Sequence, residues 1–234
     1  KLQNFKYMLI IRGSVILSTT ILCLLIIYFS LCYNDIFSLH PFFMSFGFLF
    51  LMLNGINSIV SQDETFLGLL KSRSQKIKAH WIFESLSVLF LFLGFIAIYA
   101  NKTLNGKPHF TTWHGFLGVV VVLYSICQLV AGSMLHWRYN LWRSILTYSS
   151  GRFIHALSGV VLYCILSFTF ILGLYTKWFK SCIFMYFNSL NTLIMYLCIV
   201  VVILNTSIVS WKVIRKYNKL LGIKLFDSRK DAQG

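Results

Sequence analysis

Residues 114–135 read HGFLGVVVVLYSICQLVAGSML, a run of 22 residues that contains no Asp, Glu, Lys or Arg. A bilayer core about 30 Å thick requires roughly 20 apolar residues per helix, so this run is long enough to cross a membrane. Five further apolar runs of similar length predict an all-α membrane protein with six transmembrane helices. We place the helices at about 13–32, 40–60, 80–100, 114–135, 153–175 and 184–210.

The composition supports a membrane protein with one domain. Of the 234 residues 58% are hydrophobic and only 12% are charged, and six helices with short connections use nearly the whole chain. We therefore expect a single transmembrane domain over residues 1–234. In a soluble protein a formal net charge of +15 would suggest nucleic acid. In a membrane protein the distribution of Lys and Arg among the loops instead indicates the topology, and we expect no nucleic-acid partner.

The distribution of Lys and Arg predicts the orientation of the chain in the bilayer. With six spans both termini share one side, and that side also holds the loops after the second and fourth helices. Of the 21 Lys and Arg residues, 17 fall on this side. Cytoplasmic loops carry an excess of these residues, so we expect both termini in the cytoplasm. The other four are Lys102, Lys107, Lys177 and Lys180.

Prolines and cysteines give weaker expectations. Pro41 and Pro108 fall at or before predicted helix starts, which suits intact spanning helices. The six cysteines show neither a CxxC nor a CxxCH pattern, so zinc ribbons and covalent c-type haem lack support. We interpret these cysteines as buried small hydrophobic residues.

Four histidines, His40, His80, His114 and His155, lie in the first turn of the second to fifth predicted helices, one on each. Ionisable residues at membrane depth are costly and usually functional. Because successive helices alternate in direction, His40 and His114 share the non-cytoplasmic side, and His80 and His155 share the cytoplasmic side. One imidazole from each of two helices suits a haem, whereas zinc sites often use an i, i+4 pair that no helix offers here.

The histidine pattern predicts two b-type haems in a central bundle formed by the second to fifth helices, with these four histidines as the iron ligands. Two imidazoles fill both axial positions of a haem iron, which favours electron transfer over oxygen chemistry. Gly47, Gly115, Gly118 and Gly159 stand near the histidines and could allow a flat ring to approach, although ordinary helix packing explains them equally well.

Other classes of membrane protein fit the sequence less well. In a proton-coupled transporter or channel the histidines would be proton-relay groups. Transporters of this kind usually contain interrupted helices, and the second to fifth predicted helices have no interior proline or matched breaks. A membrane scaffold would have no use for paired imidazoles.

The histidine segments resemble the eukaryotic cytochrome b561 family, and in particular its short single-domain branch related to a tumour suppressor candidate. The matching segments are LHP (39–41) followed by FFMSFGFLFLM, LLKSRSQKIKAHW (69–81), GKPHFTTWHG (106–115) and RFIHALSG (152–159). The resemblance implies an ascorbate-dependent transmembrane reductase with two haem b groups. Its electrons would pass from cytoplasmic ascorbate to monodehydroascorbate or a ferric chelate. It also implies homodimerisation and an endomembrane location (vesicle, lysosome or ER) rather than the plasma membrane.

The resemblance and the charges together suggest substrate-binding residues. Ascorbate is an anion, and Lys76, Lys78 and Arg152 precede the two cytoplasmic histidines, so we expect them to bind the donor. The relatives have a basic residue followed by a histidine that lines the acceptor site, which here implies Lys107 and His109. Trp113 departs from the family pattern, because the related branch tends to carry a basic residue there.

Two further ionisable side chains lie close to the predicted site. Glu84 lies one helical turn after His80, where a carboxylate could orient an imidazole. A buried carboxyl could also be neutral and hydrogen-bonded, and we favour this interpretation. His136 adjoins Trp137 and Arg138, and we interpret it as part of the interfacial aromatic belt rather than as a ligand.

Overall fold

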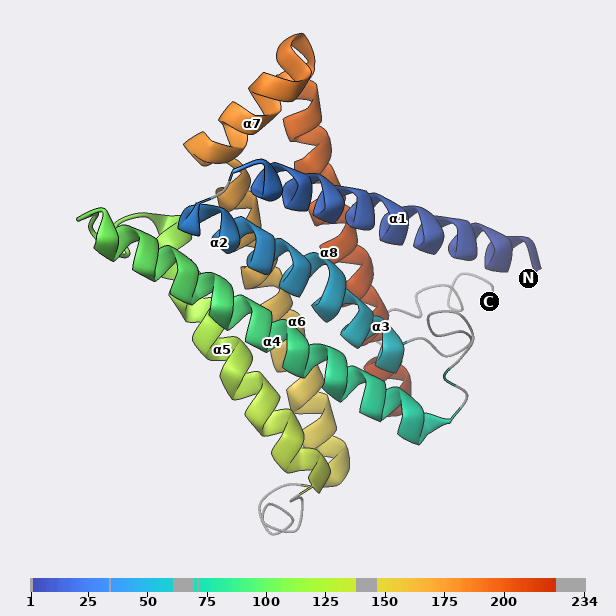
Figure 1. The fold of residues 1–234 in the computed structure, drawn as a ribbon. Coiled ribbons are helices and arrows are strands. Elements are labelled where there is room, and N and C mark those ends of the chain that lie inside the picture. Colours follow the sequence, from blue (N-terminus) through green and yellow to red (C-terminus); the bar gives the residue numbers. More distant parts are fainter. Residues whose placement is uncertain (1, 34, 61–69, 71, 138–146, 222–234) are drawn as a thin grey trace.

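The computed structural model describes residues 2–33, 35–60, 70, 72–137 and 147–221. It contains six helical segments that are long and apolar enough to cross a membrane, which confirms the predicted all-α fold with six spans (Figure 1). The chain is a multi-pass integral membrane protein. The spans are Gly13–Cys32, Ile36–Val60, Arg73–Leu104, Trp113–Trp137, Tyr148–Leu174 and Lys177–Tyr217.

Consecutive spans run in opposite directions (Figure 1). We call the end of the bundle at which the first helix begins the N side, and the other end the opposite side. The second span ends and the third begins on the N side. The helices are α1 (Leu2–Cys32), α2 (Ile36–Ser45), the π-helix η1 (Phe46–Met52), α3 (Leu53–Val60), α4 (Arg73–Leu104), α5 (Trp113–Trp137), α6 (Tyr148–Leu174), α7 (Lys177–Phe187), the 3-10 turn η4 (Asn188–Leu190) and α8 (Asn191–Leu221).

Three of the four spans that carry the paired histidines begin several residues earlier than we predicted, because polar residues cap them before the apolar run starts. Asp35 accepts a hydrogen bond from the backbone N–H of Ser38 at the start of α2. Ser72 and Gln75 form a capping box at the start of α4, and Thr147 caps α6. Such side chains satisfy the backbone N–H groups of the first turn.

The earlier starts change the depth at which three histidines lie. His80 and His155 are each the eighth residue of their helix, and His40 is the fifth. The prediction that they occupy the first turn is therefore wrong for these three, and it holds only for His114, the second residue of α5. Two turns of helix thus separate His80 and His155 from the N side.

The second span is not a uniform α-helix. Pro41 lies inside α2 rather than at a helix start, as the early start at Ile36 requires. The π-helical turn η1 follows, and its Gly47 packs against α4, where a Cβ would lie 3.2 Å from the Cβ of Phe90. The Ser87 hydroxyl donates a hydrogen bond to the Gly47 carbonyl at 2.8 Å. These contacts hold the second and third spans close together.

The predicted helix at 184–210 is interrupted in the structure. Residues 184–187 end the short helix α7, and α8 begins only at Asn191. Asn188 has a φ of 41°, in the left-handed region that a continuing α-helix cannot use. α7 and α8 therefore form a hairpin on the opposite side of the bundle (Figure 1). An apolar run does not reveal this break, because both helices are rich in apolar residues.

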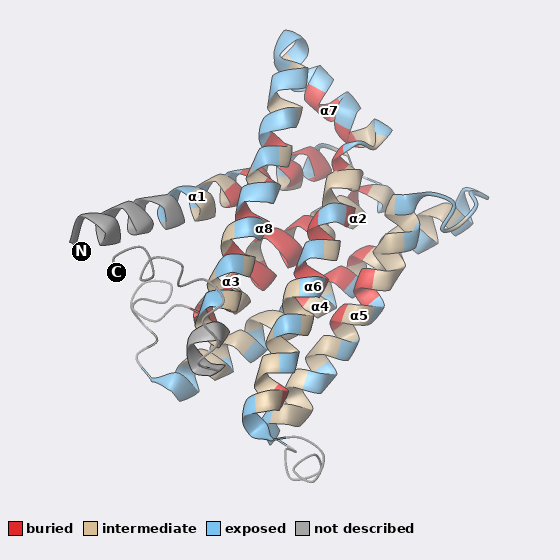
Figure 2. Ribbon diagram, turned by 180° about the vertical axis from the view of Figure 1, so that it is seen from behind, coloured by how far each residue is buried: buried red, intermediate tan, exposed pale blue. Residues whose placement is uncertain are grey.

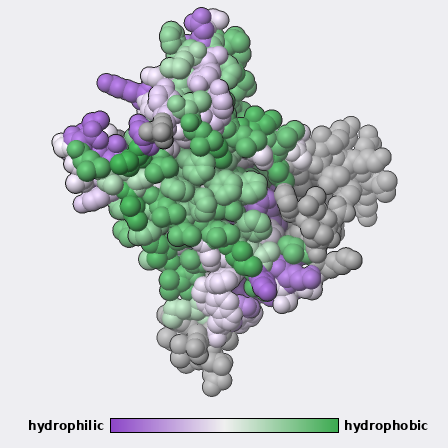
Figure 3. All heavy atoms as spheres, viewed as in Figure 1, coloured by the Kyte–Doolittle hydropathy of each residue, from purple (hydrophilic) through white to green (hydrophobic). Residues whose placement is uncertain are grey.

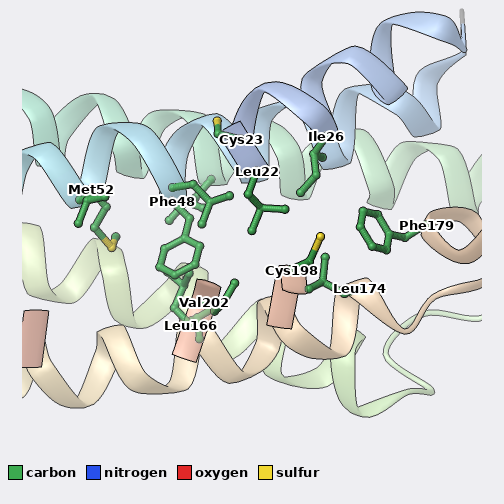
Figure 4. Packing of buried hydrophobic residues seen from close by; sticks show 14 of the residues in the cluster. Leu22, Cys23, Ile26, Phe48, Met52, Leu166, Leu174, Phe179, Cys198 and Val202 are labelled. Carbon is green, nitrogen blue, oxygen red and sulfur yellow. The ribbon is translucent and has the colours of Figure 1, made fainter. Parts of the chain in front are cut away.

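α2 to α6 form the centre of the molecule, while α1 and α8 pack against the outside. Buried residues concentrate where these helices meet (Figure 2). Phe48 and Tyr163 are among the largest fully buried side chains. Figure 4 shows that α1 contributes Leu22 and Ile26 to this core, opposite Val202 of α8. The outer helices therefore stabilise the central bundle through apolar contacts.

The exterior is apolar around the middle and polar toward the ends of the helices. Figure 3 shows hydrophobic residues across the centre of one face, with hydrophilic residues gathered at its margins. Three cysteines, Cys32, Cys127 and Cys164, lie on the exposed surface, which corrects the expectation that the cysteines are buried. An apolar surface facing lipid does not need to be buried in protein.

Candidate functional site

The four histidines lie in two facing pairs, one toward each end of the bundle. The ring centres of His40 and His114 are 6.0 Å apart, and those of His80 and His155 are 6.4 Å apart. The two ring planes are nearly perpendicular in both pairs, at 78° and 80°. Each pair joins the second or third span to the fourth or fifth. The structure therefore brings together the residues that the alternating helix directions had paired.

Backbone carbonyls determine which nitrogen of three histidines is available for a metal. A carbonyl oxygen only accepts hydrogen bonds, so an Nδ1 that contacts it carries the proton and Nε2 is the unprotonated ligand atom. His155 differs, because its Nδ1 is buried and has no hydrogen-bond partner among the described residues. The three contacts are His40 Nδ1 to Gly94 O (3.0 Å), His80 Nδ1 to Gly55 O (3.0 Å) and His114 Nδ1 to Thr169 O (2.9 Å).

Two glycines lie directly against histidine rings. A Cβ on Gly132 of α5 would lie 2.7 Å from Cε1 of His155, and a Cβ on Gly173 of α6 would lie 3.1 Å from Cε1 of His114. α5 thus carries His114 and the glycine that accommodates His155, while α6 carries His155 and the glycine that accommodates His114. Of the glycines chosen from sequence, Gly115 and Gly118 line the His40–His114 cavity and Gly159 lines the His80–His155 cavity, so their suggested role beside a flat ring stays a prediction.

The spacing of each pair leaves room for a metal ion between the rings. Metal–imidazole bonds of about 2 Å require nitrogens about 4 Å apart, and ring centres about 6 Å apart, because each centre is roughly 1 Å beyond its nitrogen. Within the described part of the chain, no group of three or more His, Cys, Asp or Glu side chains could hold a metal ion. Two imidazoles need further ligands, which a haem macrocycle supplies in its plane. The donor set therefore fits a haem.

Each histidine pair also lines a cavity. The His40–His114 cavity has a volume of about 430 Å³, and the His80–His155 cavity has a volume of about 190 Å³. The first lies within the range of about 300–1,000 Å³ that is usual for small-molecule and cofactor sites, and the second is smaller. Most of the side chains around both cavities are apolar, as is usual for cofactor sites.

At the N side, Arg152 and Lys216 are the Lys and Arg residues that line the His80–His155 cavity in the described part of the chain. Arg152 lies 5.7 Å from the centre of the Tyr148 ring, which lines the same cavity. Of the other two residues predicted to bind the donor, Lys78 is exposed and Lys76 is half-buried, and neither lines the cavity. The sequence analysis missed Lys216, because α8 was interpreted only as an outer helix that leads into a basic tail.

On the opposite side, His109 lines the His40–His114 cavity, whereas Lys107 does not. Lys107 follows the left-handed Gly106 in an exposed turn. Among the described residues, the lysines that line this cavity are Lys102, at the end of α4, and Lys177, at the start of α7. His109 is held in place by stacking on Tyr99, with ring centres 4.3 Å apart. The positive charges at the His40–His114 cavity thus come from lysines that the sequence analysis did not identify as site residues.

The family model for eukaryotic cytochrome b561 matches residues 39–180 of this chain. This match covers more than half of the chain and includes all four paired histidines. The chain belongs to the eukaryotic cytochrome b561 family. The family membership that the sequence resemblance implied is therefore confirmed. Members of this family are membrane proteins that bind haem b.

Named relatives of this cytochrome b561 chain include transmembrane reductases. The chain is 34% identical over 150 residues to transmembrane reductase CYB561D2 of Mus musculus, and the match covers 63% of this chain and 65% of the relative. It is 32% identical over 148 residues to the Homo sapiens protein of the same name, with the same two coverages. The matched region thus spans 65% of the length of these relatives. No solved structure matches the chain.

Glu84 lies close to the histidine pair on the N side of this cytochrome b561 chain but does not orient it. Its Oε1 is 3.7 Å from Nδ1 of His80, which is too long for a hydrogen bond. The Gly55 carbonyl holds that nitrogen instead. Glu84 Oε1 is buried and has no hydrogen-bond partner among the described residues. We had favoured a neutral, hydrogen-bonded carboxyl at this position, and the expected hydrogen bond is absent at Oε1.

His136 lies at the end of α5 on the N side. It is exposed, and its ring centre lies 5.2 Å from that of Trp137. It also belongs to the rim of the His80–His155 cavity. The four paired histidines are half-buried, whereas His136 is exposed. The interpretation of His136 as an interfacial residue stays a prediction.

Proposed function

We propose that this chain is a transmembrane reductase that transfers electrons between a donor on the N side and an acceptor on the opposite side. The observation that carries this proposal is the presence of two facing imidazole pairs toward opposite ends of one helix bundle. Membership of the cytochrome b561 family and the names of the matched relatives support it. We also propose that residues 1–234 form a single transmembrane domain.

The two histidine pairs are the proposed ligands of two haem b groups. His80 and His155 would hold one group, and His40 and His114 would hold the other. Bound haem would supply a one-electron carrier near each side of the membrane. The protein contributes the orientation of the imidazoles, because carbonyls of neighbouring helices fix three of the four rings. Apolar linings keep water away from both centres.

The proposed donor is cytoplasmic ascorbate, bound on the N side. The ascorbate monoanion gives up one electron and one proton and becomes the monodehydroascorbate radical. Cationic hydrogen-bond donors stabilise a bound anion, and Arg152, Lys76 and Lys78 supply such groups on this side. The excess of Lys and Arg on the side of the termini supports a cytoplasmic N side.

The proposed acceptor is monodehydroascorbate or a ferric chelate on the non-cytoplasmic side. Monodehydroascorbate takes up one electron and one proton to form ascorbate, and a ferric chelate takes up one electron to become ferrous. His109 could position an anionic acceptor at the cavity mouth, together with Lys102 and Lys177. Lys107 would act only from outside the cavity. We further propose an endomembrane location and a homodimer, as the family resemblance implies.

The proposed function is tested by the visible spectrum of the detergent-purified protein. We expect the dithionite-reduced minus oxidised difference spectrum to show the bands of b-type haem. A pyridine haemochrome assay is expected to yield about two haems per chain, one for each imidazole pair. Ascorbate in place of dithionite should then reduce a large part of the same haem. A haem-free but folded protein would overturn the proposal and favour the proton-coupled transporter or channel.

Replacing Lys177 by glutamine is expected to weaken the binding of an anionic acceptor. The change removes a charge that lines the His40–His114 cavity, so the concentration of ferric citrate that half-saturates reoxidation of the reduced protein should rise about threefold to tenfold. The control is Lys107→Gln, which removes an equal charge from the exposed turn outside the cavity. A larger effect at Lys107 than at Lys177 would contradict this assignment.

A further inference from the structure

The outer helix α8 brings a lysine into the cavity of the N-side histidine pair. Lys216 lies near the end of α8, in the sixth span and 61 positions after His155 in the chain. It nevertheless lines the His80–His155 cavity, together with its neighbour Tyr217. The central four helices are therefore not the only source of polar groups for this site.

Lys216 lies in a positively charged environment. It is close enough to interact electrostatically with Arg152, Lys76 and Arg73, and also with His80. Among the described residues that line the cavity, Glu84 is the one acidic side chain, and no ion pair joins it to Lys216. In the described part of the chain these like charges gather without an acidic partner in an ion pair, and like charges repel one another. A bound anion would relieve this repulsion.

Lys216 also has a structural contact. Its Nζ donates a hydrogen bond to the carbonyl of Ile59, in the last turn of α3. A lysine at this position interacts favourably with the C-terminal end of a helix. An ammonium group has three N–H donors, so the bond to Ile59 leaves capacity for a ligand in the cavity. The carbonyl holds the ammonium in place at the cavity wall.

We propose that Lys216 is a further binding residue for the anionic electron donor, and that it acts with Arg152 at the mouth of the His80–His155 cavity. This inference rests on the proposed function and deepens it, because it assigns the donor site to Arg152 and Lys216, which both line the cavity. A small organic monoanion such as ascorbate matches two adjacent cations. Lys76 and Lys78 then contribute to the surrounding field from outside the cavity.

The test compares Lys216→Gln with Lys216→Arg and with the control Lys212→Gln in the full-length, haem-loaded protein. Lys212 is a matched control, because it lies one helical turn earlier on α8 and donates to Asn57 of α3 but does not line the cavity. The rate of haem reduction is measured by stopped-flow over a range of ascorbate concentrations, and again with a neutral hydroquinone. Haem content and the thermal unfolding midpoint are measured for every variant.

For Lys216→Gln we expect the half-saturating ascorbate concentration to rise about tenfold, because a charge-assisted hydrogen bond is lost, while the limiting rate changes less than about twofold. Lys216→Arg should restore most of the affinity, and reduction by the neutral hydroquinone should not change. An unchanged half-saturation in Lys216→Gln would overturn the inference alone. So would an equal rise in Lys212→Gln, because that result indicates a purely structural contact with α3. A wild-type protein that dithionite reduces but ascorbate does not would overturn the proposed donor as well.

Discussion

Replacement of His155 by alanine is expected to lower the haem content of the purified protein from about two to about one per chain, because one axial ligand of the N-side haem is lost. His155 faces His80 with ring centres 6.4 Å apart, and no other histidine is paired with His80 among the described residues. The haem that remains should keep the spectrum of the His40–His114 pair. The pyridine haemochrome assay and the reduced minus oxidised spectrum measure both effects.

The control for this prediction is His136→Ala, because His136 lies on the rim of the same cavity but is exposed and faces no other histidine ring. It should keep about two haems per chain if the paired residues alone are the ligands. Loss of both haems from a folded His155→Ala protein would show that the two centres do not form independently.

The second large effect is expected from Gly132→Val. A Cβ at this position would lie 2.7 Å from Cε1 of His155, which is closer than carbon atoms can approach without movement. The His155 ring must then rotate or shift away from His80. Since haem ligation needs both imidazoles in place, we expect the N-side haem to be lost and about one haem per chain to remain. The haem count and the spectrum of the remaining haem check the result.

Two further variants make the second prediction specific. Gly173→Val should affect the other haem, because a Cβ there would lie 3.1 Å from Cε1 of His114. Gly13→Val is the control for the substitution itself: Gly13 lies in α1, where a Cβ would meet nothing within 4 Å. Full haem content in both Gly132→Val and Gly173→Val would show that these glycines do not determine the positions of the rings.

The sequence was sufficient to predict the parts of the fold that depend on local composition. The run at 114–135 and five others like it predict six spans, and the structure confirms this number. The histidine pairs also followed from sequence, since alternating helix directions put His40 level with His114. Helix starts were less predictable. Polar capping residues such as Ser72 extend α4 beyond the apolar run, so the search for apolar residues missed its first two turns.

Side-chain neighbours from distant helices could not be predicted in the same way. The family resemblance suggested Lys107 at the acceptor site, whereas the structure places Lys177 on the cavity wall. The sequence also singled out Gly118, which lines the His40–His114 cavity, but it did not reveal Gly132, which lies against the ring of His155. Lys216 belongs to an outer helix that the histidine pattern does not include. No local signal in the sequence connects these residues to the site.

The amino-acid sequence by itself determined the helical membrane fold, the family and which histidines pair on each side of the bundle, because span length, helix direction and residue spacing are properties of single segments. Only the tertiary structure decided which carbonyls hold the imidazoles, which glycines accommodate them and which cations reach the cavities. These contacts depend on how each helix is rotated about its axis and on where its ends lie. Packing between helices sets both, because the apolar surface of a membrane helix allows many rotations until close contacts select one.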